Sequence, residues 1–372
     1  MSKQRLTIHA LGDSIVTAYG SDSDNFIGGW GDHLSCFFDN QLTAVNIYAE
    51  GGRSSRSFLN EGRFIDYGIF TYNEFPYHMG PAINKIHKGD YVLIQFGHND
   101  DDSKEKLTYI DRMTPLGTPD EKGIYPTIVP TDDKKVETII PKEYISLLLK
   151  DGISNEKIEE SLKKYKEILL IYGDLYWSYS CGATYKGYLQ YYIDKIREVG
   201  AIPILVTPAV RQYFDGNKII ALPGHHGYTD KFGDFPYVRA VRQLASQEQV
   251  VLLDLFDKSL KLAEMLGAND ARFLQSIKDE EGLTIGEARY NRPKKWVEEY
   301  DMCIEKQLYA QVDNTHQNRF GSYIFAAFLV KSIYEQIPLL RPYIFERPRK
   351  SVACPNCLKG RLNEIIDFVY RV

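Results

Sequence analysis

The sequence has few cysteines, no long apolar run and no basic stretch, and each of these absences argues against a class of protein. Five scattered cysteines among 372 residues are too few for a disulfide framework, and no apolar run approaches the length that spans a bilayer. A formal net charge of −5 argues against a nucleic-acid partner. The first five residues lead straight into an apolar run and leave no room for a signal peptide. We therefore expect a cytoplasmic protein with no membrane and no nucleic-acid partner.

Five short apolar runs, rich in β-branched residues, predict strands that are buried on both faces. They are residues 6–11, 43–48, 91–96, 202–206 and 250–255. Helical patterns fall at residues 30–38, 81–87, 185–199 and 236–247, and a strongly apolar helix is predicted from residue 320 to about 337. Strands that alternate with helices in this way predict an α/β protein, in which helices cover both faces of a parallel sheet.

Polar motifs follow the predicted strands, at the edge where parallel α/β sheets form their sites. Gly12 would allow the sharp turn that presents Ser14 to a substrate. A further motif precedes the last apolar helix. The four motifs are Gly12-Asp13-Ser14, Glu50-Gly51-Gly52-Arg53, Gly97-His98-Asn99-Asp100 and Asp313-Asn314-Thr315-His316.

Together these motifs hold the residue types that acyl transfer needs. Ser14 is a weak nucleophile until a base removes its proton, and His316 is the natural base. Asp313 can hold the imidazole in one tautomer and stabilise its cation. The negative oxygen of a tetrahedral intermediate needs hydrogen-bond donors, which the backbone of Ser14 and Gly52 and the amide of Asn99 would supply.

Each motif has a simpler explanation when it is taken alone. Gly51 and Gly52 fit an ordinary loop, and Asn99 fits a turn after a strand. Asp313 and His316 fit a helix N-cap and a surface histidine. The joint occurrence of four such segments, in order and each at a strand end or a helix start, favours the catalytic interpretation.

The set Ser14, Gly52, Asn99 and His316 resembles the four blocks of the SGNH, or GDSL, hydrolase superfamily. The segments 46–64, 97–100, 185–211 and 313–316, with Gly321 behind the last, resemble its rhamnogalacturonan acetylesterase branch. The resemblance implies a flavodoxin-like three-layer α/β/α fold with a five-stranded parallel sheet. It also implies a Ser14–His316–Asp313 triad, an oxyanion hole built from Ser14, Gly52 and Asn99, and no metal or organic cofactor.

The chain departs from that pattern in three places. A large insertion at residues 101–184 follows the third strand and could form a lid, a substrate wall or a surface subdomain; its second half predicts an amphipathic helix. Residues 258–307 hold further helical patterns and a charged stretch that begins at Lys278. The tail at 346–372 carries Cys354 and Cys357, which are half of a zinc site with no second pair. We expect one hydrolase domain over 1–345, followed by this tail.

Three further side chains near the motifs are candidates for binding substrate. Arg53 and Arg56 could grip the carboxylate of a uronic acid, although structural roles fit equally well. His98 lies next to Asn99, where packing or support of the site is the more natural role.

The sequence therefore predicts a serine esterase that removes O-acetyl groups from carbohydrate, most plausibly from pectic, rhamnogalacturonan-type oligosaccharides. One alternative is an SGNH esterase or lipase that acts on another ester, such as a xylan acetyl group, a lipid or a thioester. A second alternative is a carbohydrate-binding protein without turnover. Neither the sugar nor the oligomeric state follows from the sequence.

Overall fold

The computed structural model describes residues 5–20, 26–65, 81–101, 112, 114, 116–127, 149, 154–156, 159, 184–222, 229–278 and 296–371. Its elements are β1 (Leu6–Gly12), α1 (Gly31–Leu34), η1 (Ser35–Phe37), β2 (Thr43–Ile47), α2 (Ser55–Asn60), η2 (Ala82–Lys85), β3 (Tyr91–Gln95), α6 (Tyr185–Glu198), β4 (Ile202–Val206), β5 (Phe214–Asp215), β6 (Lys218–Ile219), α7 (Pro236–Glu248), β7 (Val251–Leu253), α8 (Leu255–Ala271), η4 (Arg272–Leu274), β8 (Gln275–Lys278), α10 (Trp296–Glu305), β9 (Gln311–Gln317), α11 (Arg319–Gln336), η5 (Pro338–Tyr343), η6 (Asn356–Arg361) and α12 (Leu362–Arg371).

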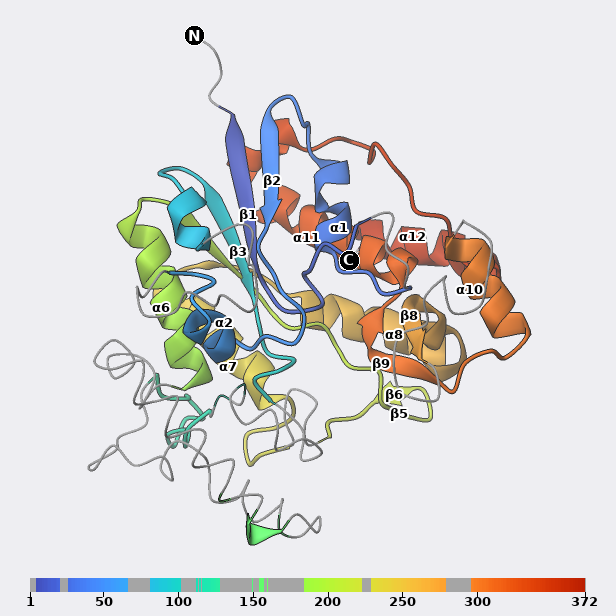
Figure 1. Ribbon diagram of the computed structural model, residues 1–372, viewed down its shortest axis with the longest axis horizontal. Helices are drawn as coiled ribbons and strands as arrows, with labels where there is room; N and C mark the ends of the chain where they lie inside the picture. The colour runs from blue at the N-terminus through green and yellow to red at the C-terminus, as the bar shows by residue number, and fades with distance from the viewer. Residues whose placement is uncertain are drawn as a thin grey trace.

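The main sheet has five parallel strands in the order β2-β1-β3-β4-β7, which confirms the predicted α/β fold (Figure 1). All five predicted strands are present within two residues of their predicted bounds. In the register of the central pairs, Ile8 lies opposite Val45 on one side and Tyr91 on the other. Because the strands are parallel, the segments that follow β1, β2, β3 and β4 meet at one edge of the sheet.

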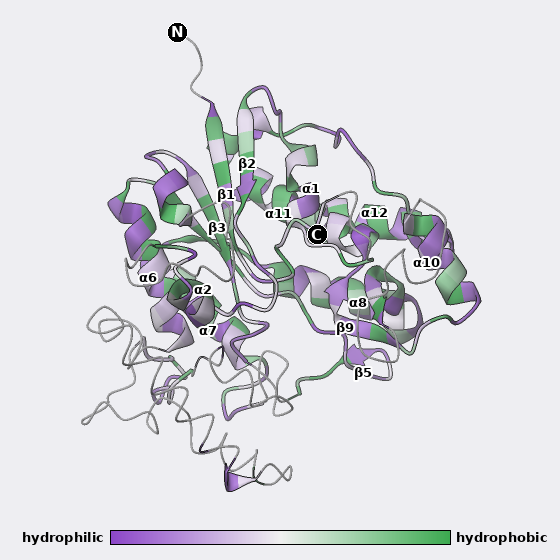
Figure 2. Cartoon of the chain, viewed as in Figure 1, coloured by the Kyte–Doolittle hydropathy of each residue, from purple (hydrophilic) through white to green (hydrophobic). Residues whose placement is uncertain are grey.

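Each face of the sheet packs into a separate apolar core, because successive side chains of a strand point to opposite faces. On β3, Leu93 belongs to the core that contains α1, α8 and α11, whereas Val92 and Ile94 belong to the core that contains α2, α6 and α7. All three side chains are fully buried. Figure 2 shows the apolar residues concentrated on the strands and on the helix faces turned toward them. The arrangement is the three-layer α/β/α fold.

Helix α11 is apolar on almost every side, as expected for a helix enclosed by its neighbours. It contacts α1, α8 and α12, and Phe328 at its centre is fully buried. The C-terminal tail adds to the same core, because Ile365 and Val369 of α12 are buried there. No described helix is long and apolar enough to cross a membrane.

Two predicted helices differ from the structure or lie outside it. The helix expected at 81–87 is only the 3₁₀ turn η2, because the chain becomes extended at Ile86 and then turns at Gly89 to enter β3. Of the amphipathic helix expected from Ile158 to Leu169, the structure describes only Glu159, which is helical, so this prediction stays untested. Two short antiparallel pairs, β5-β6 and β8-β9, complete the described strands, and no sequence pattern predicted them.

Candidate active site

Ser14 lies in a tight turn at the end of β1. Only 6% of its surface is exposed to solvent. Asp13 braces the turn, because its Oδ1 accepts a hydrogen bond of 2.9 Å from the backbone N–H of Ile15. The structure requires glycine at residue 12 because β3 lies too close for a Cβ. Its backbone is not in the left-handed conformation. A Cβ at residue 12 would lie 2.5 Å from the carbonyl oxygen of Gln95 on β3 and would also clash with Val16.

The structure brings the three predicted triad residues together. The Oγ atom of Ser14 lies 2.9 Å from Nε2 of His316, although 302 residues separate the two in sequence. The other ring nitrogen of His316, Nδ1, lies 2.7 Å from Oδ2 of Asp313. With the proton on Nδ1, the imidazole donates to Asp313 and offers Nε2 as acceptor to the Ser14 hydroxyl. This is the arrangement in which a histidine acts as general base toward a serine.

Asp313 and His316 lie on β9, which pairs with β8 in a separate antiparallel sheet, and not in the first turn of a helix. The helix begins later, at α11, where Asn318 is the N-cap and accepts from Gly321. The end of β9 is held against the loop after β1, because the N–H of Gly28 donates to the carbonyl of Gln317 at 2.9 Å. The base therefore reaches Ser14 from outside the main sheet.

The Asp313 carboxylate is buried but well supplied with donors. The backbone N–H groups of Thr315 and His316 donate to its Oδ1 at 2.8 and 3.1 Å, and the ammonium of Lys278 lies 3.2 Å from its Oδ2. Burial alone would raise the pKa of Asp313, but the neighbouring His316 and Lys278 outweigh it and hold this pKa below its usual range. The group is thus ionised and able to stabilise an imidazolium. The sequence placed Lys278 only in a charged stretch and gave no sign of this contact.

The glycine loop after β2 passes beside the nucleophile. Gly52 has a φ of +77°, a left-handed conformation that glycine adopts without steric penalty. A Cβ built on Gly51 would lie 3.8 Å from the Cβ of Ser14, which is ordinary van der Waals contact. The loop then enters α2 through a capping box in which Ser54 and Ser57 satisfy each other's backbone N–H groups. This rigid entry fixes the loop relative to Ser14.

Asn99 joins the third motif to the second, because its Nδ2 donates to the carbonyl oxygen of Arg53 at 3.1 Å. The residue after it, Asp100, is buried and accepts from both the N–H and the hydroxyl of Ser55 at the start of α2. Burial raises the pKa of Asp100 to about 7, and the donors of Ser55 oppose that rise. Asn99 is therefore held by neighbours that anchor the end of β3 to the glycine loop.

His98 anchors the other side of Asn99. Its Nδ1 lies 3.1 Å from Oδ2 of Asp13, and its Nε2 lies 3.1 Å from the carbonyl oxygen of Ala209. Both partners are acceptors, so the ring satisfies both only when both nitrogens carry hydrogen. Burial lowers the pKa of His98, and the Asp13 carboxylate, which favours the charged ring, opposes that fall. His98 thus ties the Ser14 turn to the segments that follow β3 and β4.

Two of the three candidate substrate-binding side chains are buried, and the third, Arg53, pairs within the protein. His98 and Arg56 are 2% and 1% exposed, so neither is placed to grip a substrate. The Nε of Arg53 lies within 3.1 Å of both carboxylate oxygens of Glu61, and its Nη1 donates to the carbonyl of Gly51. Arg53 therefore acts within the protein, where it stabilises the glycine loop.

The tail cysteines are thiols at the start of η6. Cys354 is buried in the core that contains α1, α8 and α11. Burial raises the pKa of both Cys354 and Cys357 to about 12. Within the part of the chain that the structure describes, no three His, Cys, Asp or Glu side chains are grouped closely enough to hold a metal ion.

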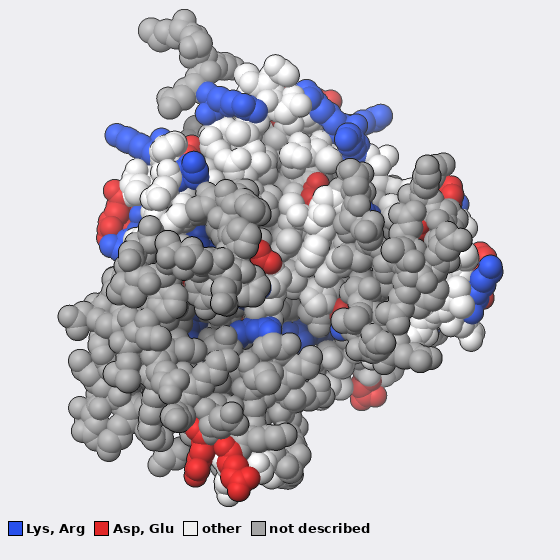
Figure 3. Space-filling model, in the orientation of Figure 1, with Lys and Arg blue, Asp and Glu red and all other residues white. Residues whose placement is uncertain are grey.

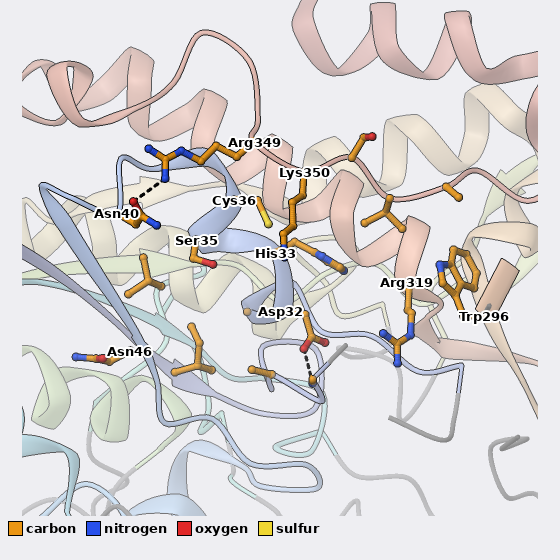
Figure 4. A pocket seen from close by; sticks show the side chains of 18 residues that line it. Asp32, His33, Ser35, Cys36, Asn40, Asn46, Trp296, Arg319, Arg349 and Lys350 are labelled. Carbon is orange, nitrogen blue, oxygen red and sulfur yellow. Dashed lines mark hydrogen bonds between the residues drawn. The ribbon is translucent and has the colours of Figure 1, made fainter. Parts of the chain in front are cut away.

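A hollow of about 910 Å³ lies apart from the triad, between α1, the edge strand β2 and the C-terminal tail (Figure 4). Asp32, Arg319 and Lys350 are among its lining residues, and Arg349 at its rim donates to the Oδ1 of Asn40. Neither Ser14 nor His316 lines it. The hollow is therefore not the site of the triad chemistry.

Comparison with known proteins by sequence gives relatives that are named as esterases. No family model matches the chain. The probable rhamnogalacturonan acetylesterase YesY of Bacillus subtilis is 25% identical over 254 residues, which cover 68% of this chain and 71% of the relative. The rhamnogalacturonan acetylesterase RhgT of the same organism is 24% identical over 274 residues, covering 74% of this chain and 75% of the relative.

Solved structures of similar proteins include a catalytic mutant of the acetylxylan esterase Axe2 from Geobacillus stearothermophilus, with a TM-score of 0.39 and 11% identity over 89% of this chain and 96% of that one. A lipase/acylhydrolase from Enterococcus faecalis has a TM-score of 0.36 and 12% identity, over 93% of this chain and 100% of that one. The sequence relatives confirm the resemblance drawn from the motifs: this chain is a carboxylic ester hydrolase that resembles the rhamnogalacturonan acetylesterase branch of the SGNH hydrolases.

Proposed function

We propose that the protein is a serine esterase that hydrolyses O-acetyl esters of pectic, rhamnogalacturonan-type oligosaccharides through an acyl-enzyme on Ser14. The observation that carries the proposal is the hydrogen-bonded chain from Ser14 through His316 to Asp313, with distances of 2.9 and 2.7 Å. The acetylated carbohydrate substrate is supported by the relatives, which are named as rhamnogalacturonan acetylesterases.

In the first half of the reaction, His316 Nε2 takes the proton of the Ser14 hydroxyl as Oγ attacks the acetyl carbonyl carbon. The resulting negative oxygen accepts hydrogen bonds from the backbone N–H groups of Ser14 and Gly52 and from the amide of Asn99. His316 then gives its proton to the departing sugar alcohol, and the carbon–oxygen bond to the sugar breaks. Asp313 stabilises the imidazolium that exists between these two transfers.

In the second half, water replaces the sugar alcohol. His316 removes a proton from the water, which attacks the acetyl group on Ser14, and then returns that proton to the Ser14 oxygen as acetate leaves. The residues and the oxyanion donors are the same in both halves, so one site performs both steps.

Hydrolysis of p-nitrophenyl acetate by the wild type and by Ser14→Ala tests the mechanism. We expect turnover by the wild type and none above background by the variant, with an unchanged Tm. Equal rates for the two proteins would overturn the serine mechanism and would favour a binding protein without turnover.

Acetate release from a panel of acetylated oligosaccharides tests the substrate. The panel contains rhamnogalacturonan, homogalacturonan and xylan fragments of matched length, and kcat/KM is compared among them. Preference for the rhamnogalacturonan fragments supports the proposal. Preference for xylan, or activity only on long-chain acyl esters, would assign the same triad to another ester.

A further inference from the structure

One side chain of the insertion reaches the glycine loop and Asn99. Arg112 is a described residue of the insertion at 101–184. Its Nη1 donates to Oδ1 of Asn99 at 3.3 Å. The same Nη1 lies 3.4 Å from the position that a Cβ on Gly52 would occupy. Arg112 therefore bonds to Asn99 and lies beside Gly52, the two residues after β3 and β2 that the mechanism uses as oxyanion donors. Figure 3 shows Lys and Arg atoms near the centre of the face that it draws.

The backbone around Arg112 is anchored to the end of β3. The hydroxyl of Thr114 donates to the carbonyl oxygen of Arg112 at 3.0 Å, and the N–H of Thr114 donates to the carbonyl of Asp100 at 3.0 Å. Tyr237 of α7 donates its hydroxyl to the carbonyl of Thr114 at 2.7 Å. Thr114 is 1% exposed, so this anchor is buried. Hydrogen bonds thus hold the backbone of Arg112 in place beside β3.

The contact with Arg112 determines which end of the Asn99 amide faces which way. A guanidinium has only donors, so Arg112 accommodates the Oδ1 end and not the NH₂ end. The carbonyl of Arg53 has only acceptor capacity, so it takes the Nδ2 end. The two neighbours exclude the flipped amide, in which Oδ1 would meet the carbonyl of Arg53. An NH₂ group carries two hydrogens, and the one that does not bond Arg53 is the donor for a substrate oxygen.

We propose that Arg112 is a positioning residue for the oxyanion pocket, which acts by holding the Asn99 amide with Nδ2 toward the reacting carbonyl. This inference rests on the proposed function, since it concerns the donor that stabilises the tetrahedral intermediate. A flipped Asn99 would present a partial negative charge to a negative oxygen, and so would weaken the transition state more than the bound substrate. Loss of Arg112 should therefore lower kcat and leave KM nearly unchanged.

A double-mutant cycle on p-nitrophenyl acetate, which has no carboxylate for an arginine to bind, tests this. The variants are Arg112→Met, Arg112→Lys, Asn99→Ala and the double variant Arg112→Met/Asn99→Ala. Arg371→Met, at a side chain that is 78% exposed on α12, is the matched control and should keep wild-type activity. The Tm of each variant reports whether it folds.

We expect Arg112→Met and Asn99→Ala each to lower kcat by about 10²-fold, the order expected for loss of one oxyanion donor. The double variant should be within about 3-fold of Asn99→Ala, because Arg112 acts through Asn99 and has nothing left to position. Arg112→Lys, which keeps a cationic donor group on a shorter, non-planar head, should fall between the wild type and Arg112→Met.

Three results would overturn the inference: an unchanged kcat in Arg112→Met, a rise in KM alone, or additive losses in the double variant. The last two would make Arg112 a group that contacts the substrate. A wild type that shows no ester hydrolysis, or that Ser14→Ala matches, would overturn the proposed function and this inference with it. If the wild type is active and depends on Ser14, but Arg112→Met keeps the wild-type kcat, the inference about Arg112 is overturned and the proposed function stands.

Discussion

Replacing Asp313 by asparagine changes one atom of the triad and preserves its shape. The Oδ1 atom of Asp313 accepts from two backbone N–H groups, and Oδ2 accepts from His316 Nδ1. If the asparagine carbonyl keeps the backbone bonds, its NH₂ group faces Nδ1. The ring must then carry its proton on Nε2, which can no longer accept the proton of Ser14. If the amide turns round, its NH₂ group faces two N–H donors instead. Either orientation removes the base or strains the site.

We expect Asp313→Asn to lower kcat by roughly 10⁴-fold, the size known for a triad whose histidine is forced into the wrong tautomer. This corresponds to about 5 kcal/mol of transition-state stabilisation. KM should change little, because the defect lies in proton transfer and not in substrate binding.

The measurement is kcat on p-nitrophenyl acetate beside the Tm of each protein. Asp367→Asn, at an exposed residue of α12 that pairs with Arg371, is the control for the chemical change itself. An Asp313→Asn variant that folds normally and keeps kcat within about 10-fold of the wild type would refute the role given to Asp313.

Two further predictions concern stability. Burial raises the pKa of Asp100 to about 7 from the ordinary 3.8, so the folded protein keeps a proton that the unfolded chain releases. Wild-type stability should therefore fall as pH rises between those values, and Asp100→Asn should lack that component; parallel curves of Tm against pH would contradict it. Gly12→Ala would force a Cβ to 2.5 Å from the carbonyl of Gln95 and should destabilise the protein by about 1–3 kcal/mol or more. Urea unfolding measures this loss, and Gly360→Ala, which has open space around it, should show almost none.

The main sheet was predictable because its central strands, β1, β3 and β4, are largely buried on both faces. Such strands are short, nearly continuous apolar runs, and the run at 202–206 matches β4 residue for residue. The parallel arrangement then placed Ser14, Gly52 and Asn99 at one edge without any knowledge of the packing. The β8-β9 pair had no comparable signal, since Asp313 and Asn314 are poor strand formers and their conformation depends on tertiary contacts.

The partners of individual charged side chains were not predictable from local sequence pattern. Arg53 stands in a motif next to the expected site, yet Glu61 and the Gly51 carbonyl hold its guanidinium. Lys278 and Arg112 contact Asp313 and Asn99, and nothing in the residues around them in the sequence distinguishes them from solvated surface charges. The glycine of the Gly-Asp-Ser motif was predicted to shape a turn, whereas the structure requires it because β3 lies against its Cα.

The location of His316 on β9, outside the main sheet, has a consequence for how the protein folds. Ser14 lies near the start of the chain and its base lies 302 residues later, so the bond between them closes a loop of most of the sequence. Contacts of such long separation form late, because the entropy of closing the loop must be overcome before the contact rewards it. The central sheet contains β1 to β4 and β7, without β9, so Ser14 can reach its place in the fold before His316 is brought beside it. On refolding, esterase activity should therefore return after the spectroscopic signal of the sheet.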